Sequence, residues 1–307
     1  MNGYDSPSPV TAGYHSIPDR VHNALVSVIV PTRNSEKHLE ECLRSIKAQT
    51  YASLELIVVD NYSSDKTLEI ARRYADIVHS VGPERSAQVN HGVRISSGTY
   101  VYRVDADFRL DAGVIEECVK LMQQGHGAVV VHNTADATVG RLARVRKFEV
   151  DMYKYSLDHT AARFLTRDLF LAVGGLREDV TAGEDYDFQN RLRRTGISIA
   201  FADAEAVHLD EPRALAPLMK KYYQYGRDFP NYRQYNRVES RQQLSFFRKD
   251  YLRHWRRFTT HPVLAGMFVA YHFTKYAAGA FGYMTAAVAR RTARTASGPG
   301  AAEEVSR

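Results

Sequence analysis

The sequence of 307 residues contains only two cysteines, Cys42 and Cys118. A framework of several disulfides and a zinc site built from cysteines are therefore excluded, and free thiols suit a reducing compartment. Residues 1–24 contain no basic stretch followed by an apolar run, so no secretory signal is expected. Hydrophobic residues make up 44% of the chain and charged residues 25%, which excludes a fibrous, a largely disordered or a polytopic membrane protein.

Composition divides the chain into four segments. Residues 1–24 are rich in Pro, Ser and Gly, and residues 293–307 are small and polar. We expect the first segment to be flexible and the second to be a disordered tail, because neither has the apolar content that offsets the entropy lost on ordering. Residues 25–211 are expected to form one α/β domain. Residues 212–292 are expected to form a helical extension.

Short β-branched runs alternate with amphipathic stretches between residues 25 and 210. Strands are predicted over 26–30, 54–59, 77–81 and 100–104, and helices over 36–49, 66–74 and 87–95. This alternation predicts an α/β fold with a Rossmann-like, mostly parallel sheet and helices on both faces. In such sheets, ligands bind beyond the carboxyl ends of the strands.

Polar residues follow three of these strands. The clusters are Pro31-Thr32-Arg33-Asn34, Asp60-Asn61-Tyr62-Ser63-Ser64-Asp65 and Asp105-Ala106-Asp107. Because the ends of neighbouring parallel strands share one edge, we expect the clusters to meet in a crevice suited to a nucleotide. Asp105 and Asp107 could coordinate a hard divalent ion that also neutralises a diphosphate. Carboxylates in this position are also common as turn formers or helix caps.

These motifs resemble those of the family-2 glycosyltransferases, which are nucleotide-sugar enzymes of the GT-A fold. That family typically reads VSVIIPxYN, then a strand ending VDDGSxDxT, then an N-x-G…A-x-G segment that enters a D-x-D strand. The corresponding segments here are VSVIVPTRN, LIVVDNYSSDKT and VNHGVRISSGTYVYRVDAD. The resemblance covers about residues 25–210 and implies a GT-A catalytic domain over 25–211. One departure is Asn61, where many members carry a second Asp.

The resemblance also implies roles for individual residues. The implied nucleotide-sugar-binding residues are Pro31, Thr32, Arg33, Asp60, Arg85, Asp105 and Ala106. Among them, Asp60 would accept a hydrogen bond from the base, and Arg85 would face the base or the diphosphate unless it is an ordinary residue at a helix start. The implied metal ligands are Asp107, Asp105 and His208, and the ion, Mn²⁺ or Mg²⁺, would act as a Lewis acid for the departing nucleoside diphosphate. A purely structural role for His208 is the alternative.

A second block, GGLRE followed by GEDYDFQNRL, occupies residues 174–192. It resembles the family's GGF-x-E…ED-x-x-L-x-x-R-L block. Inverting transfer by direct displacement requires a general base that takes the acceptor's proton. The resemblance implies that Asp185 is this base, with Glu184 as its catalytic neighbour. The alternative is that both are ordinary acids at a helix N-terminus, where the helix dipole stabilises them.

The extension from about residue 212 combines basic, aromatic and apolar residues. Between Arg241 and Arg257 the net charge is +5, close to the +6 of the whole chain. Basic residues interleaved with aromatics suit an anionic bilayer surface. The same composition also suits single-stranded nucleic acid, which is the rival partner. A third interpretation is that these helices pack on the domain or on a second subunit. The apolar run that follows is interrupted by His272 and Lys275. Its small residues at 277–282 would let two helices approach closely, so a re-entrant or dimer-forming hairpin is the alternative. We expect this segment to bind anionic bilayers without crossing them.

Taken together, these features predict a metal-dependent, inverting glycosyltransferase, a hexosyltransferase, at the cytoplasmic face of the cell membrane, peripheral or monotopic. Its donor would be a UDP- or GDP-sugar, and its acceptor a lipid-linked phosphate or saccharide in polysaccharide or glycolipid biosynthesis. No nucleic-acid partner is expected, and a homo-oligomer is possible. The alternatives are a transferase for a soluble or polymeric glycan and a non-catalytic nucleotide-sugar-binding member, although intact Asp105, Asp107, Asp185 and His208 argue against the latter. A dinucleotide-dependent dehydrogenase is disfavoured because no G-x-G-x-x-G follows the first strand.

Overall fold

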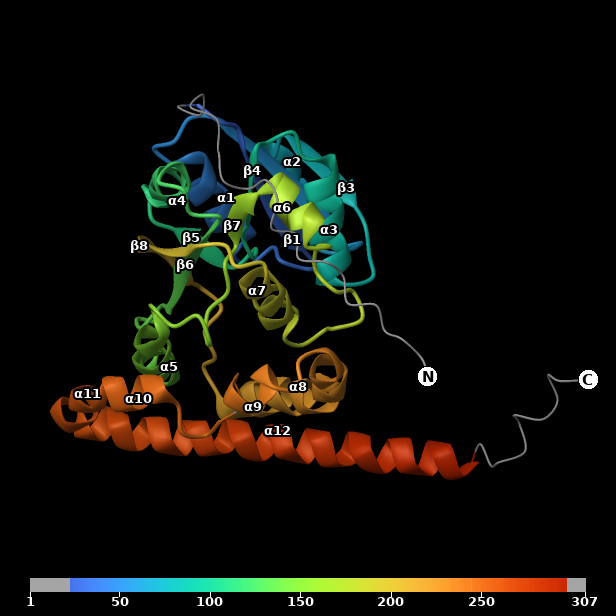
Figure 1. The fold of residues 1–307 in the computed structure, drawn as a ribbon, viewed down its shortest axis with the longest axis vertical. Helices are drawn as coiled ribbons and strands as arrows, with labels where there is room; N and C mark the ends of the chain where they lie inside the picture. The colour runs from blue at the N-terminus through green and yellow to red at the C-terminus, as the bar shows by residue number, and fades with distance from the viewer. Residues whose placement is uncertain (1–22, 244, 297–307) are drawn as a thin grey trace, which may run out of the picture.

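The structure is a computed structural model that describes residues 23–243 and 245–296. An eight-stranded sheet with helices against it forms one part, and the C-terminal helices form a layer along one side of it (Figure 1). The strands are β1 (Val26–Thr32), β2 (Leu54–Asp60), β3 (Ile77–Ser80), β4 (Tyr100–Arg103), β5 (Phe108–Leu110), β6 (Ala128–Ala135), β7 (Phe164–Thr166) and β8 (Ile199–His208). Most of the expected segment 1–24 lies outside the described residues.

The sheet is mixed and has the strand order β3-β2-β1-β4-β7-β6-β8-β5. The first four strands in this order run parallel, as the alternation of strands and helices predicted. Beyond β4, the β4–β7, β7–β6 and β8–β5 pairs are antiparallel and the β6–β8 pair is parallel. Since β2, β1 and β4 are neighbours, their carboxyl ends lie at one edge and bring the three predicted polar clusters together.

Helices cover both faces of the sheet. The helices of this domain are α1 (Leu39–Lys47), α2 (Thr67–Tyr74), α3 (Arg85–Ile95), α4 (Val114–Gln123), α5 (Arg141–Val150), α6 (Arg167–Ala172) and α7 (Glu184–Arg194). Every residue of β1 is buried, which is expected of a strand covered on both sides. Val28 and Ile29 belong to separate apolar cores, because successive strand residues point to opposite faces. Cys42 and Cys118 are free and buried in the first of these cores.

The C-terminal layer contains α8 (Leu215–Tyr235), α9 (Glu239–Gln243), α10 (Lys249–Arg253), α11 (Trp255–Thr260) and α12 (Pro262–Ala296). α12 runs along the outer side of the molecule, with α8 and α9 near its middle and α10 and α11 at one end (Figure 1). It reaches into the segment 293–307, and the rest of that expected tail lies outside the described residues. Within 23–243 and 245–296, no helix combines the length and the apolar character that crossing a membrane requires.

α8 and α12 approach each other closely at glycines. A Cβ added at Gly226 of α8 would overlap the carbonyl oxygen of Gly279, and one added at Gly282 would overlap the carbonyl oxygen of Tyr223. The small residues at 277–282 therefore allow a close helix contact, and the contact is made within one chain. It fixes α12 lengthwise against α8.

Buried amides join α7 to α8. Asn236, at the end of α8, donates to Asp187 Oδ1 at 2.9 Å, and Asn190 donates to Asn236 Oδ1 at 2.9 Å and to the Tyr232 hydroxyl at 3.2 Å. All four side chains are buried. The helix that begins with the predicted catalytic acids is therefore held by the C-terminal layer.

Candidate active site

Asp60 locks the ends of β1 and β2 together. Its carboxylate accepts hydrogen bonds from Thr32 Oγ1 at 2.8 Å, and from the Ser63 backbone N–H at 2.8 Å and hydroxyl at 2.5 Å. Gln88 of α3 donates from Nε2 to the Thr32 carbonyl oxygen at 2.8 Å, which ties α3 to the same edge. Asp60 is fully buried and both of its oxygens accept bonds within this turn. Its contact with a base stays a prediction that requires one of these bonds to be exchanged.

The other predicted nucleotide-binding residues surround this edge. Pro31 is buried within β1, whereas Arg33 is exposed just beyond it. Arg85 is the first residue of α3 and its guanidinium is directed at Asp105 Oδ1, 3.8 Å away. Ala106 is buried between the two aspartates of the Asp-x-Asp turn. The residues therefore share one region, as expected.

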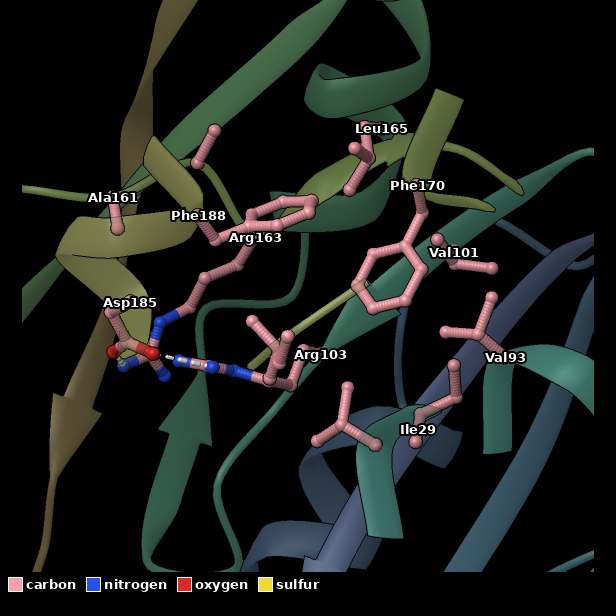
Figure 2. A pocket seen from close by; sticks show the side chains of 13 residues that line it. Ile29, Val93, Val101, Arg103, Ala161, Arg163, Leu165, Phe170, Asp185 and Phe188 are labelled. Carbon is pink, nitrogen blue, oxygen red and sulfur yellow. Dashed lines mark hydrogen bonds and ion pairs between the residues drawn. The ribbon is translucent and has the colours of Figure 1, made fainter. Parts of the chain in front are cut away.

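Three arginines and three carboxylates meet where β4 ends and α7 begins. They are Arg85, Arg103, Arg163, Asp105, Glu184 and Asp185. Arg163 bridges two of the acids, with Nη1 2.8 Å from Asp105 Oδ2 and Nη2 3.2 Å from Asp185 Oδ2. Arg103 Nη1 lies 2.5 Å from Asp185 Oδ1, and Figure 2 shows both guanidinium groups converging on Asp185. Arg85 forms an ion pair with Glu184.

This network shifts the pKa values of the two neighbouring acids of α7 in opposite directions. Burial alone would raise the pKa of Asp185, but Arg103 and Arg163 outweigh it and hold that pKa well below its usual range. The pKa of Glu184 is raised, by burial and then by the negative charge of Asp185. Glu184 is therefore the stronger base in this arrangement. Asp185 could serve as a base only where another anion takes its two arginines.

Arg103 and Arg163 are functional candidates that the sequence motifs did not predict. The Arg103 side chain is only 8% exposed. Its Nε and Nη2 atoms have no hydrogen-bond partner in the described structure. It borders a cavity of about 20 Å³ that Arg163, Asp185 and apolar side chains also line (Figure 2). A charged residue at the end of the otherwise apolar strand β4 was the available signal, since an ion is rarely buried without a partner.

Asp107 and His208 come together beside this network. The pairing of β5 with β8 sets Phe108 opposite His208, and His208 Nε2 lies 3.2 Å from Asp107 Oδ2. Its other ring nitrogen, Nδ1, lies 2.9 Å from Glu211 Oε1, and Glu211 also accepts from Arg146 at 3.1 Å. Burial lowers the pKa of His208, but hydrogen bonds to Asp107 and Glu211 raise it above its usual value.

This geometry fits part of the predicted metal site. A histidine whose far nitrogen is bonded to a carboxylate, with a second carboxylate at its near nitrogen, is a typical support for a divalent ion. Asp105 does not join this pair, because it is ion-paired with Arg163 and Arg85. In the described part of the chain, no three His, Cys, Asp or Glu side chains lie close enough together to hold an ion. Asp107 and His208 could therefore contribute two ligands.

Residues 27–176 match the family model described as "Glycosyl transferase family 2". This part of the chain belongs to that family. The glycosyltransferase AglE of Haloferax volcanii is 26% identical over 220 residues, 66% of this chain and 72% of that protein. The glycosyltransferase GlyG of Streptococcus pneumoniae is 33% identical over 116 residues, 36% of this chain and 38% of that protein, so the chain spans well under half of GlyG.

The fold of this chain is also found in solved structures. The mannosyltransferase PcManGT from Pyrobaculum calidifontis, in complex with GDP-Man and Mn²⁺, superposes with a TM-score of 0.54 and 21% identity over 92% of this chain and 78% of that chain. The expected GT-A fold with a C-terminal helical extension is therefore confirmed. The family match contains Arg103, Asp107 and Arg163 but ends before Asp185 and His208, whose roles stay predictions.

Proposed function

We propose that this glycosyltransferase transfers a sugar from a nucleoside diphosphate sugar to a lipid-linked acceptor, with inversion and with a divalent metal. The observation that carries the proposal is that the Asp107–His208 pair and the arginine–carboxylate network lie together at the carboxyl ends of the parallel strands, where such sheets bind nucleotides. Membership of the family supports it. The GDP-Man and Mn²⁺ bound by PcManGT support the choice of donor class and ion.

Asp107 and His208 are the residues that would hold Mn²⁺ or Mg²⁺. Such ions commonly take few protein ligands and complete their coordination with water and substrate phosphates, so a pair of side chains is sufficient to begin a site. The bound ion would neutralise charge on the departing nucleoside diphosphate. Arg85, at the N-terminus of α3 and 3.8 Å from Asp105, would add a positive charge to the same site.

The arginines also bear on the acceptor. A sugar hydroxyl must lose a proton during transfer, and Asp185 can take it once Arg103 and Arg163 pair with phosphate oxygens instead. A lipid-linked phosphate is already ionised, so it would need the arginines for binding and no base. Both acceptor classes would therefore use Arg103 and Arg163, whereas only a sugar hydroxyl would also need Asp185 as a base.

We place the reaction at the cytoplasmic face of a membrane. Cys42 and Cys118 are free, as in proteins of reducing compartments. A transferase for a soluble or polymeric glycan would share the donor site but would not need a membrane.

The test begins with the donor. The purified full chain is incubated with a panel of UDP- and GDP-sugars, with Mn²⁺, with Mg²⁺ or with excess chelator, and binding and hydrolysis are measured. Polyprenyl phosphate, a lipid-linked saccharide and a soluble glycan are then compared as acceptors with the best donor. Metal-dependent transfer to a lipid-linked acceptor supports the proposal. Donor binding without any turnover would identify a non-catalytic member, and preference for the soluble glycan would refute the acceptor class.

A further inference from the structure

The two ionisable residues that interrupt the apolar run of α12 lie on its buried side. His272 and Lys275 are both buried, and Lys275 Nζ donates to the two carboxylate oxygens of Glu149 in α5 at 2.7 and 2.6 Å. Its neighbours on this side, Phe268 and Tyr271, pack in the apolar cluster between α12 and the sheet domain. The polar interruptions of the apolar run therefore face the protein.

The opposite side of α12 is apolar and exposed. Between Pro262 and Met284, a range that the structure describes in full, no exposed residue carries a charge. The large exposed side chains are Val263, Val269, Phe273, Phe281, Tyr283 and Met284, and Phe273 and Phe281 are 67% and 58% exposed. A helix that faces water normally shows its polar residues outward, so this pattern is the reverse of the usual one.

The exposed apolar surface is concentrated in the C-terminal layer. Before α8, only Tyr62, Tyr155 and Leu171 are exposed large hydrophobic residues among those the structure describes. Large contiguous apolar surface on a protein marks an interaction site, whereas single exposed residues do not. On α12, Val269, Phe273, Phe281 and Met284 are exposed at helical spacing along one side, so they belong to one surface.

Basic and aromatic residues are also exposed at one end of α12. In α10 and α11, which lie there (Figure 1), Leu252 and Trp255 are exposed next to the exposed Arg253 and Arg256. The guanidinium of Arg256 lies over the Trp255 ring, 5.8 Å from its centroid. Tryptophan beside arginine is typical of the headgroup region of a bilayer, where the ring is buried and the charge meets lipid phosphate.

We propose that this docking face, defined by Leu252, Trp255, Val263, Phe273, Phe281 and Met284, lies in the headgroup region of an anionic bilayer with α12 parallel to the surface. Lys275 and the close contact with α8 hold the helix lengthwise on the protein, which is incompatible with a separate membrane span. The face is separate from the predicted catalytic residues, so it can be tested without the transfer reaction.

Charge favours a lipid surface over a second copy of the chain. From Lys249 to Arg290, the only acidic residue is Asp250, and it is buried. Two such faces packed together would therefore offer no carboxylate to Arg253 and Arg256. Anionic lipid phosphates supply that counter-charge, and the acyl chains accept the phenylalanines.

Vesicle flotation of the full chain tests the proposal. The protein is expected to float with phosphatidylglycerol-containing vesicles at low salt and to bind less well to phosphatidylcholine alone or at high salt. Phe273→Asp and Phe281→Asp should each lower vesicle partition by about tenfold, because each removes an aromatic ring from the apolar phase. Leu171→Asp, which changes an exposed apolar residue of α6, should bind like the unaltered protein.

The arginines are tested by Arg253→Gln and Arg256→Gln, each expected to lower binding to anionic vesicles about fivefold at low salt only. Thermal unfolding and donor hydrolysis should be unchanged in all variants, which separates loss of docking from misfolding and from failure of the proposed function. Absence of flotation on anionic vesicles would overturn the proposal. Unchanged vesicle binding by both Phe273→Asp and Phe281→Asp would also overturn it. A dimer in solution that Phe273→Asp converts to a monomer, without vesicle binding, would identify the face as an interface between copies.

Discussion

Lys275 of α12 and Glu149 of α5 form a buried ion pair, with both carboxylate oxygens within 2.7 Å of the ammonium nitrogen. The ammonium also lies over the Tyr222 and Tyr271 rings, 5.3 and 4.7 Å from their centroids. Lys275 interrupts the apolar run in the sequence, and in the fold it joins the C-terminal layer to the sheet domain. A charge that disfavours membrane insertion thus contributes a specific internal contact.

Removing only the lysine should destabilise the protein. Lys275→Met leaves the Glu149 carboxylate buried without its cationic partner, and we expect the free energy of unfolding to fall by about 3–5 kcal/mol. The double variant Lys275→Met/Glu149→Leu removes both charges and should recover most of this loss. Denaturant unfolding measures both, with Lys249→Met at an exposed position as the control. A single variant as stable as the unaltered protein would contradict the role of the pair.

The same pair predicts a dependence of stability on pH. Burial alone would raise the pKa of Glu149, but Lys275 and the hydrogen bonds to it hold that pKa well below its ordinary value of 4.5. The unfolded chain therefore binds a proton at a higher pH than the folded one, so the stabilisation is complete above about pH 4.5 and is lost progressively below it. When unfolding is measured over a pH series, the difference in free energy of unfolding between the wild type and Glu149→Gln should become smaller in acid. A difference in free energy of unfolding that stays constant over this pH range would contradict the expectation.

Two glycines form a matched pair for testing the contact between α8 and α12. A Cβ at Gly226 would overlap the Gly279 carbonyl oxygen, whereas a Cβ at Gly266 would meet no atom within 4 Å. We expect Gly226→Ala to lower the free energy of unfolding by about 1–3 kcal/mol through overpacking. Gly266→Ala should cause no loss and a gain of up to about 1 kcal/mol, since alanine favours the helix. Equal effects of the two substitutions in denaturant unfolding would contradict the close contact between α8 and α12 at Gly226.

Metal dependence is expected to act through Asp107. Its side chain is 35% exposed and contacts His208, so Asp107→Ala should lower transfer by orders of magnitude and leave the unfolding temperature unchanged. Asp168→Ala, at an exposed carboxylate of α6, is the control and should keep its activity. Chelator should abolish transfer by the wild type, and added Mn²⁺ or Mg²⁺ should restore it. Full activity in excess chelator would refute the metal assignment.

Asp185→Asn should distinguish the two acceptor classes. With a sugar hydroxyl as acceptor, we expect turnover to fall by about 10²-fold or more, because a general base is removed, while donor affinity changes little. With a lipid phosphate as acceptor, the loss should be small. Glu184→Gln is the companion variant, since burial and the neighbouring charge raise the pKa of Glu184. Near wild-type turnover by Asp185→Asn on a hydroxyl acceptor would place the base at Glu184 or Asp187.

The parallel half of the sheet could be predicted from the sequence, because its signals are local. The apolar run of β1 is long, and the inward residues of α1, such as Leu39 and Leu43, recur at helical spacing. The two shortest strands of the other half carry no such signal. β5 and β7 contain three residues each, and their places beside β8 and β4 depend on contacts made only in the folded chain.

The candidate site shows the same division. Asp107 and His208 lie together as the resemblance implied. The position of Asp105 could not be read from the Asp-x-Asp motif, because it depends on Arg163, 58 residues away in the sequence. Arg163 precedes a strand too short to predict, so its approach to Asp105 and Asp185 follows from tertiary structure alone.

The buried amides that connect α7 to α8 also have a consequence for how the chain can be divided. Asn236 donates to Asp187 and, together with Tyr232, accepts from Asn190, and a chain ending near residue 211 would lack both of these partners. A buried polar group that loses its partner destabilises its surroundings by about 1–3 kcal/mol, and here the surroundings are the first turns of the helix that presents Glu184 and Asp185. The change in composition near residue 212 is therefore no natural cleavage point for producing an active fragment, and recombination between related enzymes should preserve α7 and α8 as one inherited unit.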